Sequence, residues 1–242
     1  MVPDGKAMKL AIIPARGGSK RIPHKNVRPF CGKPIIAYSI EAANSSQLFD
    51  EVMVSTDDSA IADIARQYGA SVPFLRSAAA STDHATTAEV LLEVVEQYKK
   101  AEKEFAYICC IYPTAPFVTA EKLQTAFQLL LEKEADALIP VVPFSYPPLR
   151  GLKVDNGNLR MKWPENASVR TQDLEPLYHD CGQFYLIRTD ALMKERTLFC
   201  KSTAPMHLSE LEVQDIDNEE DWKLAEQKYS FYITGNIGEE SV

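Results

Sequence analysis

The stretch KLAIIPARGGSKRIPHKN, residues 9–26, joins a short apolar segment to a loop rich in glycine and positive charge. An uninterrupted apolar run such as 9–15 is typical of a strand that is buried on both faces. The following positions 16–28 hold five of the chain's 26 lysines and arginines, although the formal net charge of the 242 residues is −8. Such a concentration of positive charge after a buried strand predicts a binding site for a phosphate-bearing small anion.

Strands and helices continue to alternate along the chain. The expected strands are 9–15, 50–56, 71–75, 105–112, 136–142 and 181–188, and the expected helices are 34–46, 57–69, 86–104, 119–135 and 218–229. This order predicts an α/β fold of the Rossmann-like kind, with a mostly parallel sheet and helices on both faces. Such sheets bind ligands where their strands end, so the basic loop should lie at that edge.

Residues 143–180 interrupt this alternation. They have little helical periodicity, and residues 152–161 have the Asn-Gly turn of a β-hairpin. We therefore expect a single domain over residues 8–229, with 143–180 as an extension from it. Residues 230–242 are expected to form a frayed tail.

The composition argues against several functions. Hydrophobic residues make up 45% and charged residues 25%, as in soluble globular proteins. The acidic balance argues against nucleic-acid partners, and no apolar stretch approaches the roughly 18 residues of a membrane span. The five cysteines show no CxxC spacing and the N-terminus shows no secretory signal. Free thiols in a cytoplasmic protein are therefore expected.

The glycines of the loop allow close approach to an anion. Gly17 and Gly18 would leave backbone amides accessible, and Ser19 adds a hydroxyl donor. The loop matches neither the Walker A pattern nor G-x-G-x-x-G. A solvated basic loop without a ligand is the alternative, which the position directly after the first strand disfavours.

Several longer motifs resemble those of the acylneuraminate cytidylyltransferase family, whose members activate acidic nine-carbon sugars as CMP derivatives. These motifs are IIPARGGSKRIPHKN, GKPIIAYSIEAA, EVMVSTDD, VPFLR, YHDCGQFY and QDIDNEEDW. The resemblance runs from about residue 9 to residue 229 and is strongest to the branch that acts on pseudaminic acid. It implies the nucleotide-diphospho-sugar transferase version of the Rossmann-like fold.

The resemblance also implies which residues bind the nucleotide. Arg16 and Lys25 match basic residues that contact the triphosphate, and they are the expected catalytic pair. The full nucleotide-binding set is Ala15, Arg16, Gly17, Gly18, Ser19, Lys25, Asn26, Arg76 and Thr87. In that set, Arg76 and Thr87 would lie at the cytidine and its ribose. The alternative is that their region is only a loop, with Thr86 or Thr87 capping the next helix.

Asp215 and Asp217 are candidates for a metal site. In an extended segment, residues two apart point to the same side. Two carboxylates suit Mg²⁺, which completes its coordination with water and substrate phosphates. Alternatively, Asp217 caps the following helix, with Glu220 completing a capping box. The resemblance places metal ligands at both aspartates and so favours Mg²⁺ as the cofactor.

Four residues are expected to contact the sugar, namely Tyr112, His179, Gln183 and Phe184. Tyr112 ends a strand at the ligand edge, where the neuraminic acid branch has a glutamine. Its alternative role is packing in the core. His179 lies in a segment that faces the sugar in the family, although it could also be a general base or an ordinary hydrogen-bonded histidine.

These features predict transfer of CMP from CTP to the anomeric hydroxyl of a nonulosonic acid, with release of diphosphate. Pseudaminic acid is the expected sugar, and N-acetylneuraminic acid is the nearest alternative. The resemblance also implies a homodimer in which residues 143–180 contact the second subunit. Two other classes remain. One is a glycosyltransferase that uses a nucleotide sugar, although its D-x-D pattern usually ends a mid-chain strand. The other is a non-catalytic nucleotide-binding regulator.

Overall fold

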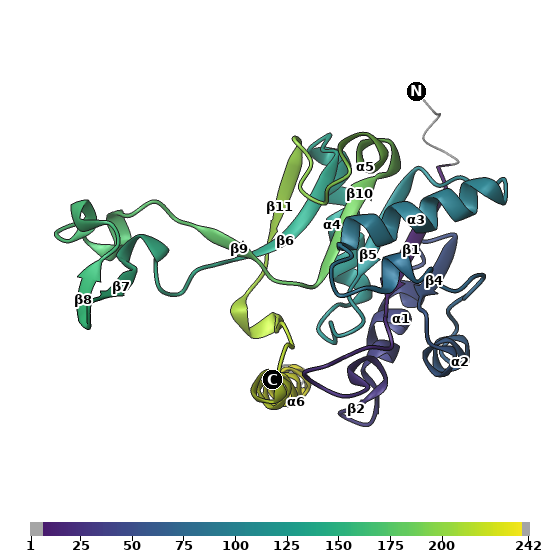
Figure 1. Ribbon diagram of the computed structural model, residues 1–242, viewed down its shortest axis with the longest axis horizontal. Helices are drawn as coiled ribbons and strands as arrows, with labels where there is room; N and C mark the ends of the chain where they lie inside the picture. Colours follow the sequence, from purple (N-terminus) through teal and green to yellow (C-terminus); the bar gives the residue numbers. More distant parts are fainter. Residues whose placement is uncertain (1–6, 239–242) are drawn as a thin grey trace.

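The computed structural model describes residues 7–238, which are arranged around a central sheet (Figure 1). The strand order is β11-β6-β10-β5-β1-β4, and β9 pairs with β6. The strands are β1 (Lys9–Pro14), β4 (Glu51–Ser55), β5 (Tyr107–Ile111), β6 (Ala137–Pro143), β9 (Tyr178–Asp180), β10 (Phe184–Arg188) and β11 (Thr203–His207). Pairing of β1 with β4 and β5, and of β6 with β11, is parallel, whereas β10 runs antiparallel to β5 and β6. The predicted mostly parallel α/β sheet is confirmed.

Helices cover both faces of this sheet. They are α1 (Ile35–Ser45), α2 (Ser59–Gln67), α3 (Thr87–Lys100), α4 (Ala120–Glu132), α5 (Thr189–Glu195) and α6 (Glu219–Gly238). Successive residues of β1 point to opposite faces of the sheet and therefore pack in different hydrophobic cores. Ile13 packs in the core that contains Leu123 of α4, and Ile12 packs with Leu91 of α3 and Leu192 of α5. All five of these side chains are fully buried.

Some short elements differ from the prediction. Helix α5 has only seven residues, about two turns, and strand β11 has the sequence TAPMH, with a proline and no continuous apolar run, so neither carries a clear apolar pattern. The predicted strand at 71–75 is reduced to one bridge between Met53 and Ser71. Pro73 lacks the backbone N–H that a longer pairing would need.

Residues 144–177 form an arm that leaves the sheet after β6 and returns at β9 (Figure 1). Its hairpin consists of β7 (Leu152–Asp155) and β8 (Asn158–Met161) around the predicted Asn-Gly turn. Asn156 and Gly157 have φ values of 50° and 78°, the left-handed pair of a tight hairpin turn. The expected extension over 143–180 therefore has a distinct shape as well as a distinct sequence.

An aromatic cluster attaches α6 to the start of the domain. Trp222 packs edge-on against Phe30, at 5.6 Å between ring centroids, and Tyr229 packs against Phe30 and Tyr38. Phe30 belongs to a small hairpin of β2 (Pro29–Phe30) and β3 (Lys33–Pro34). Because α6 runs to Gly238, the prediction of a frayed tail is wrong for 230–238, and residues 239–242 lie outside the described part.

Two predictions from composition can be compared with the structure. No helix among the described residues is long and apolar enough to cross a membrane. All five cysteines are free, and four of them are buried. The expectation of unpaired thiols is therefore confirmed.

Candidate functional site

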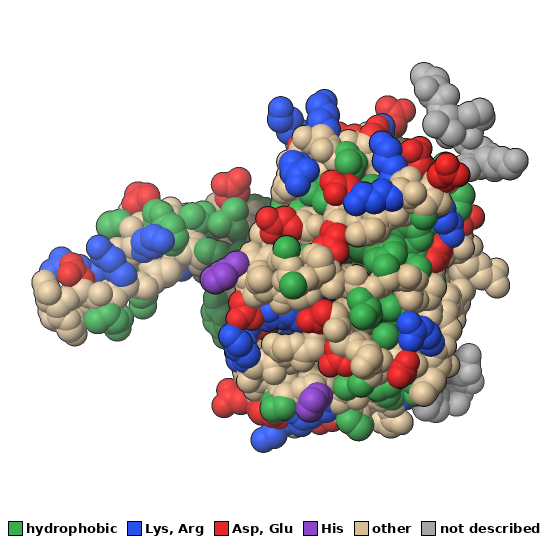
Figure 2. All heavy atoms as spheres, turned by 45° about the vertical axis from the view of Figure 1, so that its right-hand side comes forward, with side chains coloured by type: hydrophobic (Ala, Val, Ile, Leu, Met, Phe, Trp, Pro, Cys, Tyr) green, Lys and Arg blue, Asp and Glu red, His purple; other side chains and the backbone are tan. Residues whose placement is uncertain are grey.

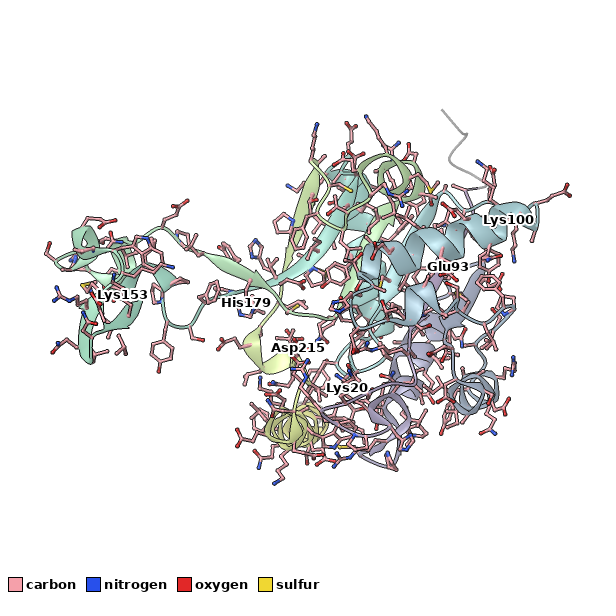
Figure 3. The ribbon with its side chains drawn as sticks, in the orientation of Figure 1. Lys20, Glu93, Lys100, Lys153, His179 and Asp215 are labelled. Atoms are coloured by element: carbon pink, nitrogen blue, oxygen red, sulfur yellow. The ribbon has the colours of Figure 1, made fainter. Side chains whose placement is uncertain are left out.

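A polar cavity of about 310 Å³ lies at the edge where β1 and β5 end. It is lined by Pro14, Arg16, Ser19, Lys20, Arg21, Ile22, Lys25, Asn26, Tyr112, Pro113, Thr114, Asp215 and Asp217. The basic loop forms one side, the turn after β5 another, and the segment before α6 the third. Figure 3 shows Lys20 and Asp215 on facing segments between α6 and the base of the arm. The position at the carboxyl ends of parallel strands is the one predicted for a ligand.

Four cations of the loop line this cavity, and carboxylates already hold three of them. Arg16 and Lys20 both bind Asp83, with 2.6 Å between Arg16 Nη1 and Asp83 Oδ1. Arg21 Nη2 lies 3.0 Å from Asp217 Oδ1. These charged side chains converge on one cavity, although those of Lys20 and Arg21 are also largely exposed to solvent.

Lys25 is the most enclosed cation of the cavity. Its Nζ donates to the Ile216 carbonyl at 2.6 Å, between the two aspartates. Burial lowers the pKa of Lys25, while Asp217 and Asp215 oppose that effect. A partly desolvated ammonium interacts more strongly with phosphate than one in water does.

Hydrogen bonds that were not predicted from the sequence fix the backbone of the basic loop. Gly17 N–H donates to Asp57 Oδ1 at 2.9 Å, and Ala15 N–H donates to the Ser55 carbonyl at 2.9 Å. These two amides are therefore used within the protein, which corrects the expectation that Gly17 offers its amide to an anion. A Cβ at Gly17 would lie 2.7 Å from Oδ2 of Asp58, the residue that caps α2. A glycine is needed at this position because any larger residue would collide with Asp58. Gly18, by contrast, has open space around it.

Asn26 supports the loop from within. It is only 5% exposed, and its Nδ2 donates to the Arg16 carbonyl at 2.9 Å. Asn26 therefore ties the two ends of the basic loop to each other. Ser19 lines the same cavity.

Asp215 and Asp217 project to the same side, as alternation along an extended segment predicts. Ile216 between them points the other way and is fully buried. The capping alternative for Asp217 is wrong, because Asn218 Oδ1 accepts from the amides of Glu220 and Asp221. Burial and the nearby Asp217 raise the pKa of Asp215.

The aspartate pair fits a magnesium ion better than a metal bound by protein alone. Across the part of the chain that the structure describes, no group of three or more His, Cys, Asp or Glu side chains could hold a metal. Mg²⁺ needs only one or two carboxylates when water and substrate phosphates supply its other ligands. Mutual repulsion of two carboxylates on one side is also relieved by a cation.

Arg76 and Thr87 lie outside the residues that line the cavity. Arg76 is 9% exposed, and its Nε and Nη2 bind Ser55, with 3.1 Å from Nε to Ser55 Oγ. It therefore supports the end of β4 behind the loop. Thr86, not Thr87, caps α3 in a capping box with Glu89. Thr87 Oγ1 instead lies 3.1 Å from the Tyr112 hydroxyl.

The four expected sugar contacts are placed differently from one another. Tyr112 lines the cavity, and His179 is exposed on β9, where its ring packs 4.8 Å from Phe144. Gln183 and Phe184 are 1% and 0% exposed. The expectation that Gln183 and Phe184 touch the sugar directly is therefore wrong. Phe184 packs in the hydrophobic core, and Gln183 donates hydrogen bonds to backbone carbonyls.

Gln183 connects the turn after β9 to the aspartate segment. Its Nε2 donates to the carbonyls of Cys181 and Gln214, at 3.0 and 3.4 Å. In the same turn, Gly182 has a φ of 62°, and a Cβ there would lie 3.4 Å from Asp215 Cγ. Sequence reasoning chose this segment correctly, but it could not show that Gln183 points inward.

Some lining residues were absent from the predicted set. Lys20 and Arg21 belong to the basic run itself, so the charge pattern could have found them. Pro113 and Thr114 follow Tyr112 directly and could have been inferred from the strand end. Asp83, which binds two cations, is 67 residues from Arg16 and has no sequence signal for this role.

The fold and the cavity together define a nucleotidyltransferase-like α/β protein. A solved structure of CMP:2-keto-3-deoxy-manno-octonic acid synthetase complexed with CTP superposes with a TM-score of 0.68. The superposition covers 93% of this chain and 99% of that one at 16% identity, so it shows the fold. A 4-diphosphocytidyl-2C-methyl-D-erythritol synthase from Anaerococcus prevotii gives a TM-score of 0.61 at 13% identity.

The sequence model described as "Cytidylyltransferase" matches residues 10–229, and the chain belongs to that family of enzymes. It is 37% identical to the pseudaminic acid cytidylyltransferase of Campylobacter jejuni, over 91% of this chain and 95% of the relative. It is 35% identical to the CMP-N,N'-diacetyllegionaminic acid synthase of Legionella pneumophila, over 90% and 94%. The resemblance inferred from the motifs is therefore confirmed.

Proposed function

We propose that this enzyme transfers CMP from CTP to the anomeric hydroxyl of a nonulosonic acid, releasing diphosphate, and that pseudaminic acid is its preferred sugar. The observation that carries the proposal is the cavity itself. It joins four cations from one loop to two carboxylates on a segment that lies far away in sequence. The whole-length similarity to a pseudaminic acid cytidylyltransferase supports the choice of sugar.

The residues of the cavity suit attack of a hydroxyl on the α-phosphate. Arg16 and Lys25 would neutralise the charge that develops on the leaving diphosphate, which positioned cations do without rearrangement. Lys25 is held by Ile216 and Arg16 is held by Asp83 before substrate binds, so their positions are partly set. Ser19 would add a neutral donor to a phosphate oxygen.

Asp215 and Asp217 would hold the cofactor, Mg²⁺, against the phosphates. When bound, this ion would polarise the phosphate that is attacked and orient the triphosphate. Asp217 would also keep its ion pair with Arg21, and both carboxylates would stay close to Lys25. We also propose that the enzyme acts in the cytoplasm, which its free cysteines support.

A diphosphate-release assay tests the reaction. CTP and Mg²⁺ are supplied with pseudaminic acid, N,N'-diacetyllegionaminic acid or N-acetylneuraminic acid in separate reactions. We expect the highest kcat/KM with pseudaminic acid. Equal values, or a preference for N-acetylneuraminic acid, would contradict the sugar assignment alone. Absence of diphosphate with every sugar, or turnover of a CMP-sugar donor instead, would contradict the reaction.

We further propose a homodimer that forms through the arm. One face of the arm's hairpin is apolar. On this face Leu152 lies opposite Met161, and Val154 lies opposite Leu159. Three of these are 61–73% exposed, and Figure 2 shows hydrophobic side chains gathered along the arm. A two-stranded hairpin is at best marginally stable alone, so an apolar face that is continuous across it favours a covering partner.

The oligomeric state tests this second proposal. Val154→Asp places a charge on the apolar face, whereas Lys153→Asp changes the opposite, polar face of the same strand. We expect light scattering after gel filtration to give a dimer mass for the unaltered chain and for Lys153→Asp. Val154→Asp should give a monomer mass. A monomer in all three samples would contradict the proposal.

A further inference from the structure

Asp83 binds two of the cations that line the cavity. Its Oδ1 accepts from Arg16 Nη1 at 2.6 Å, and its Oδ2 accepts from Lys20 Nζ. Arg16 and Lys20 both line the cavity, whereas Asp83 is not among the lining residues. A carboxylate that gives one oxygen to each cation engages them as two oxygens of a phosphate group would. Asp83 therefore occupies, from within the protein, the donors that an external phosphate needs.

Asp83 belongs to a short strap, residues 82–85, whose two flanks are fixed. Ala80, just before the strap, is buried, and Thr86, directly after it, caps α3. In the described part of the chain, the only hydrogen bonds from the strap to residues outside 79–86 are the two of Asp83. Release of the Asp83 carboxylate therefore breaks no other hydrogen bond between the strap and the rest of the protein.

The two ion pairs can be exchanged for a ligand. The side chains of Arg16, Asp83 and Lys20 are 38%, 43% and 78% exposed. Ion pairs between exposed groups are weak, because water and salt screen them. A ligand with several negative charges can therefore displace the carboxylate. Because the strap is tethered at both ends, the carboxylate stays near the cations at a high effective concentration and can bind them again.

We propose that Asp83 is a reversible latch, which competes with the diphosphate part of CTP for Arg16 and Lys20. This rests on the proposed function, because it takes the basic loop to hold the leaving diphosphate. The latch is closed in the free enzyme, opens when CTP binds and closes again as diphosphate leaves. It lowers the affinity of the loop for CTP and for diphosphate alike. The product is then not retained by the cations that the reaction needs.

Asp83→Asn removes the charge of the latch from an exposed side chain. Competition lowers the affinity for a ligand by the fraction of enzyme in which the latch is open. For a latch that is closed about 70–90% of the time, Asp83→Asn should raise the affinity for diphosphate roughly three- to tenfold. Isothermal titration calorimetry with inorganic diphosphate in a Mg²⁺ buffer measures this, and titration with CTP in the absence of sugar should give a similar gain. The melting temperature should stay close to that of the unaltered enzyme.

The matched control lies at the opposite end of the sheet. Asp190→Asn makes the same chemical change in an exposed carboxylate, which is paired there with Arg188. We expect this control to leave the affinities for diphosphate and CTP unchanged. A gain in the control as large as that in Asp83→Asn would overturn the inference, because any lost negative charge would then suffice.

Two further measurements separate a latch from a general effect of charge. CMP and the sugar acid are also anions, but neither carries the diphosphate part, so calorimetry with CMP and KM for the sugar should show no change in Asp83→Asn. Lys20→Ala should weaken diphosphate binding more in the Asp83→Asn background than in the unaltered enzyme, because Lys20 is no longer shared with a carboxylate there. Two substitutions that act independently would instead be additive.

The outcomes distinguish this inference from the proposed function. Unchanged diphosphate affinity in Asp83→Asn, or equal gains for diphosphate, CMP and the sugar, overturns the latch while diphosphate release still supports the reaction. Weaker diphosphate binding together with a lower melting temperature also overturns it, because Asp83 would then brace the loop for its ligand. If the unaltered enzyme binds neither CTP nor diphosphate, the proposed function fails and the latch fails with it.

Discussion

Before substrate binds, the cations of the cavity differ in whether a carboxylate is hydrogen-bonded to them. Asp83 accepts from both Arg16 and Lys20, and these hydrogen bonds lower its pKa, so it stays ionised. A triphosphate therefore has to displace an internal anion from two cations. Lys25 is different, because its partner is the neutral carbonyl of Ile216 and its charge is balanced only at longer range by the two aspartates.

Lys25→Ala should remove most turnover while leaving the fold intact. Loss of one charge-assisted contact to phosphate should lower kcat/KM for CTP by on the order of 10- to 150-fold. Lys100→Ala, at the far end of α3 (Figure 3), is the control and should change neither activity nor melting temperature. Near-normal kcat/KM for CTP in Lys25→Ala would mean that the loop does not bind the triphosphate.

Asp217→Asn should abolish activity at every Mg²⁺ concentration without lowering stability. Asn218 supplies the cap of α6, so no capping bond is lost with the Asp217 carboxylate. Diphosphate release is measured across a Mg²⁺ titration, together with thermal unfolding. Asn218→Ala is the matched control and should do the reverse, lowering stability by about 1 kcal/mol with activity retained below the melting temperature. Full activity of Asp217→Asn would exclude a metal-binding role.

At the scale of elements, one half-buried carboxylate ties β4 to the end of α3. Glu51 on β4 accepts from Tyr98 at 2.5 Å, from Ser71 at 2.6 Å and from Lys103. Burial would raise the pKa of Glu51, but these three hydrogen bonds outweigh it and hold that pKa below its usual value. The folded chain therefore favours the ionised form of Glu51.

Glu51→Gln should lower the melting temperature at pH 7 and have little effect in acid. Because the folded pKa lies below the unfolded value of about 4.3, the stabilisation is complete above that pH. It is lost as the pH falls through the folded pKa. Melting curves from pH 7 to pH 3 for Glu51→Gln, and for the exposed control Glu96→Gln on α3, measure this. A difference that persists unchanged at pH 3 would contradict the assignment.

The elements were predictable where their own residues carry a clear apolar pattern. Helix α3 and strand β1 were found because repeated apolar spacing or a continuous apolar run identifies them. Helix α5, with only seven residues, and strand β11, whose sequence TAPMH has no continuous apolar run, carry no such pattern. The antiparallel direction of β10 is a tertiary property, and it is what brings the Asp180–Gln183 turn to the ligand edge. The basic loop could be chosen from charge, whereas its carboxylate partners Asp57 and Asp83 required the fold.

At the scale of the whole molecule, the two halves of the site are joined by a small core under α6. Ile22 from the basic loop and Ile216 from between the aspartates both pack in the cluster that contains Trp222. Arg28 stacks 4.5 Å from the same ring. The relative position of loop and carboxylates is therefore set by hydrophobic packing next to the cavity.

Trp222→Ala should damage stability and substrate binding together. Removal of this buried ring should cost about 3–5 kcal/mol, and KM for CTP should rise at temperatures where the variant is still folded. Phe199→Ala removes an aromatic ring that is 60% exposed and should do neither. Thermal unfolding and diphosphate release measure both effects. A normal KM for CTP in a destabilised Trp222→Ala enzyme would show that α6 does not position the site.

The two halves of the site that this cluster joins are synthesised at different times. Lys25 precedes its partner Ile216 by 191 positions. At typical rates of synthesis, the ribosome needs about 10–40 s to cover that distance. During this interval the nascent chain carries the basic loop without Asp215 and Asp217. Asp83, which pairs with Arg16 and Lys20 in the folded protein, emerges much sooner, so it can shield part of the loop from other polyanions until α6 docks.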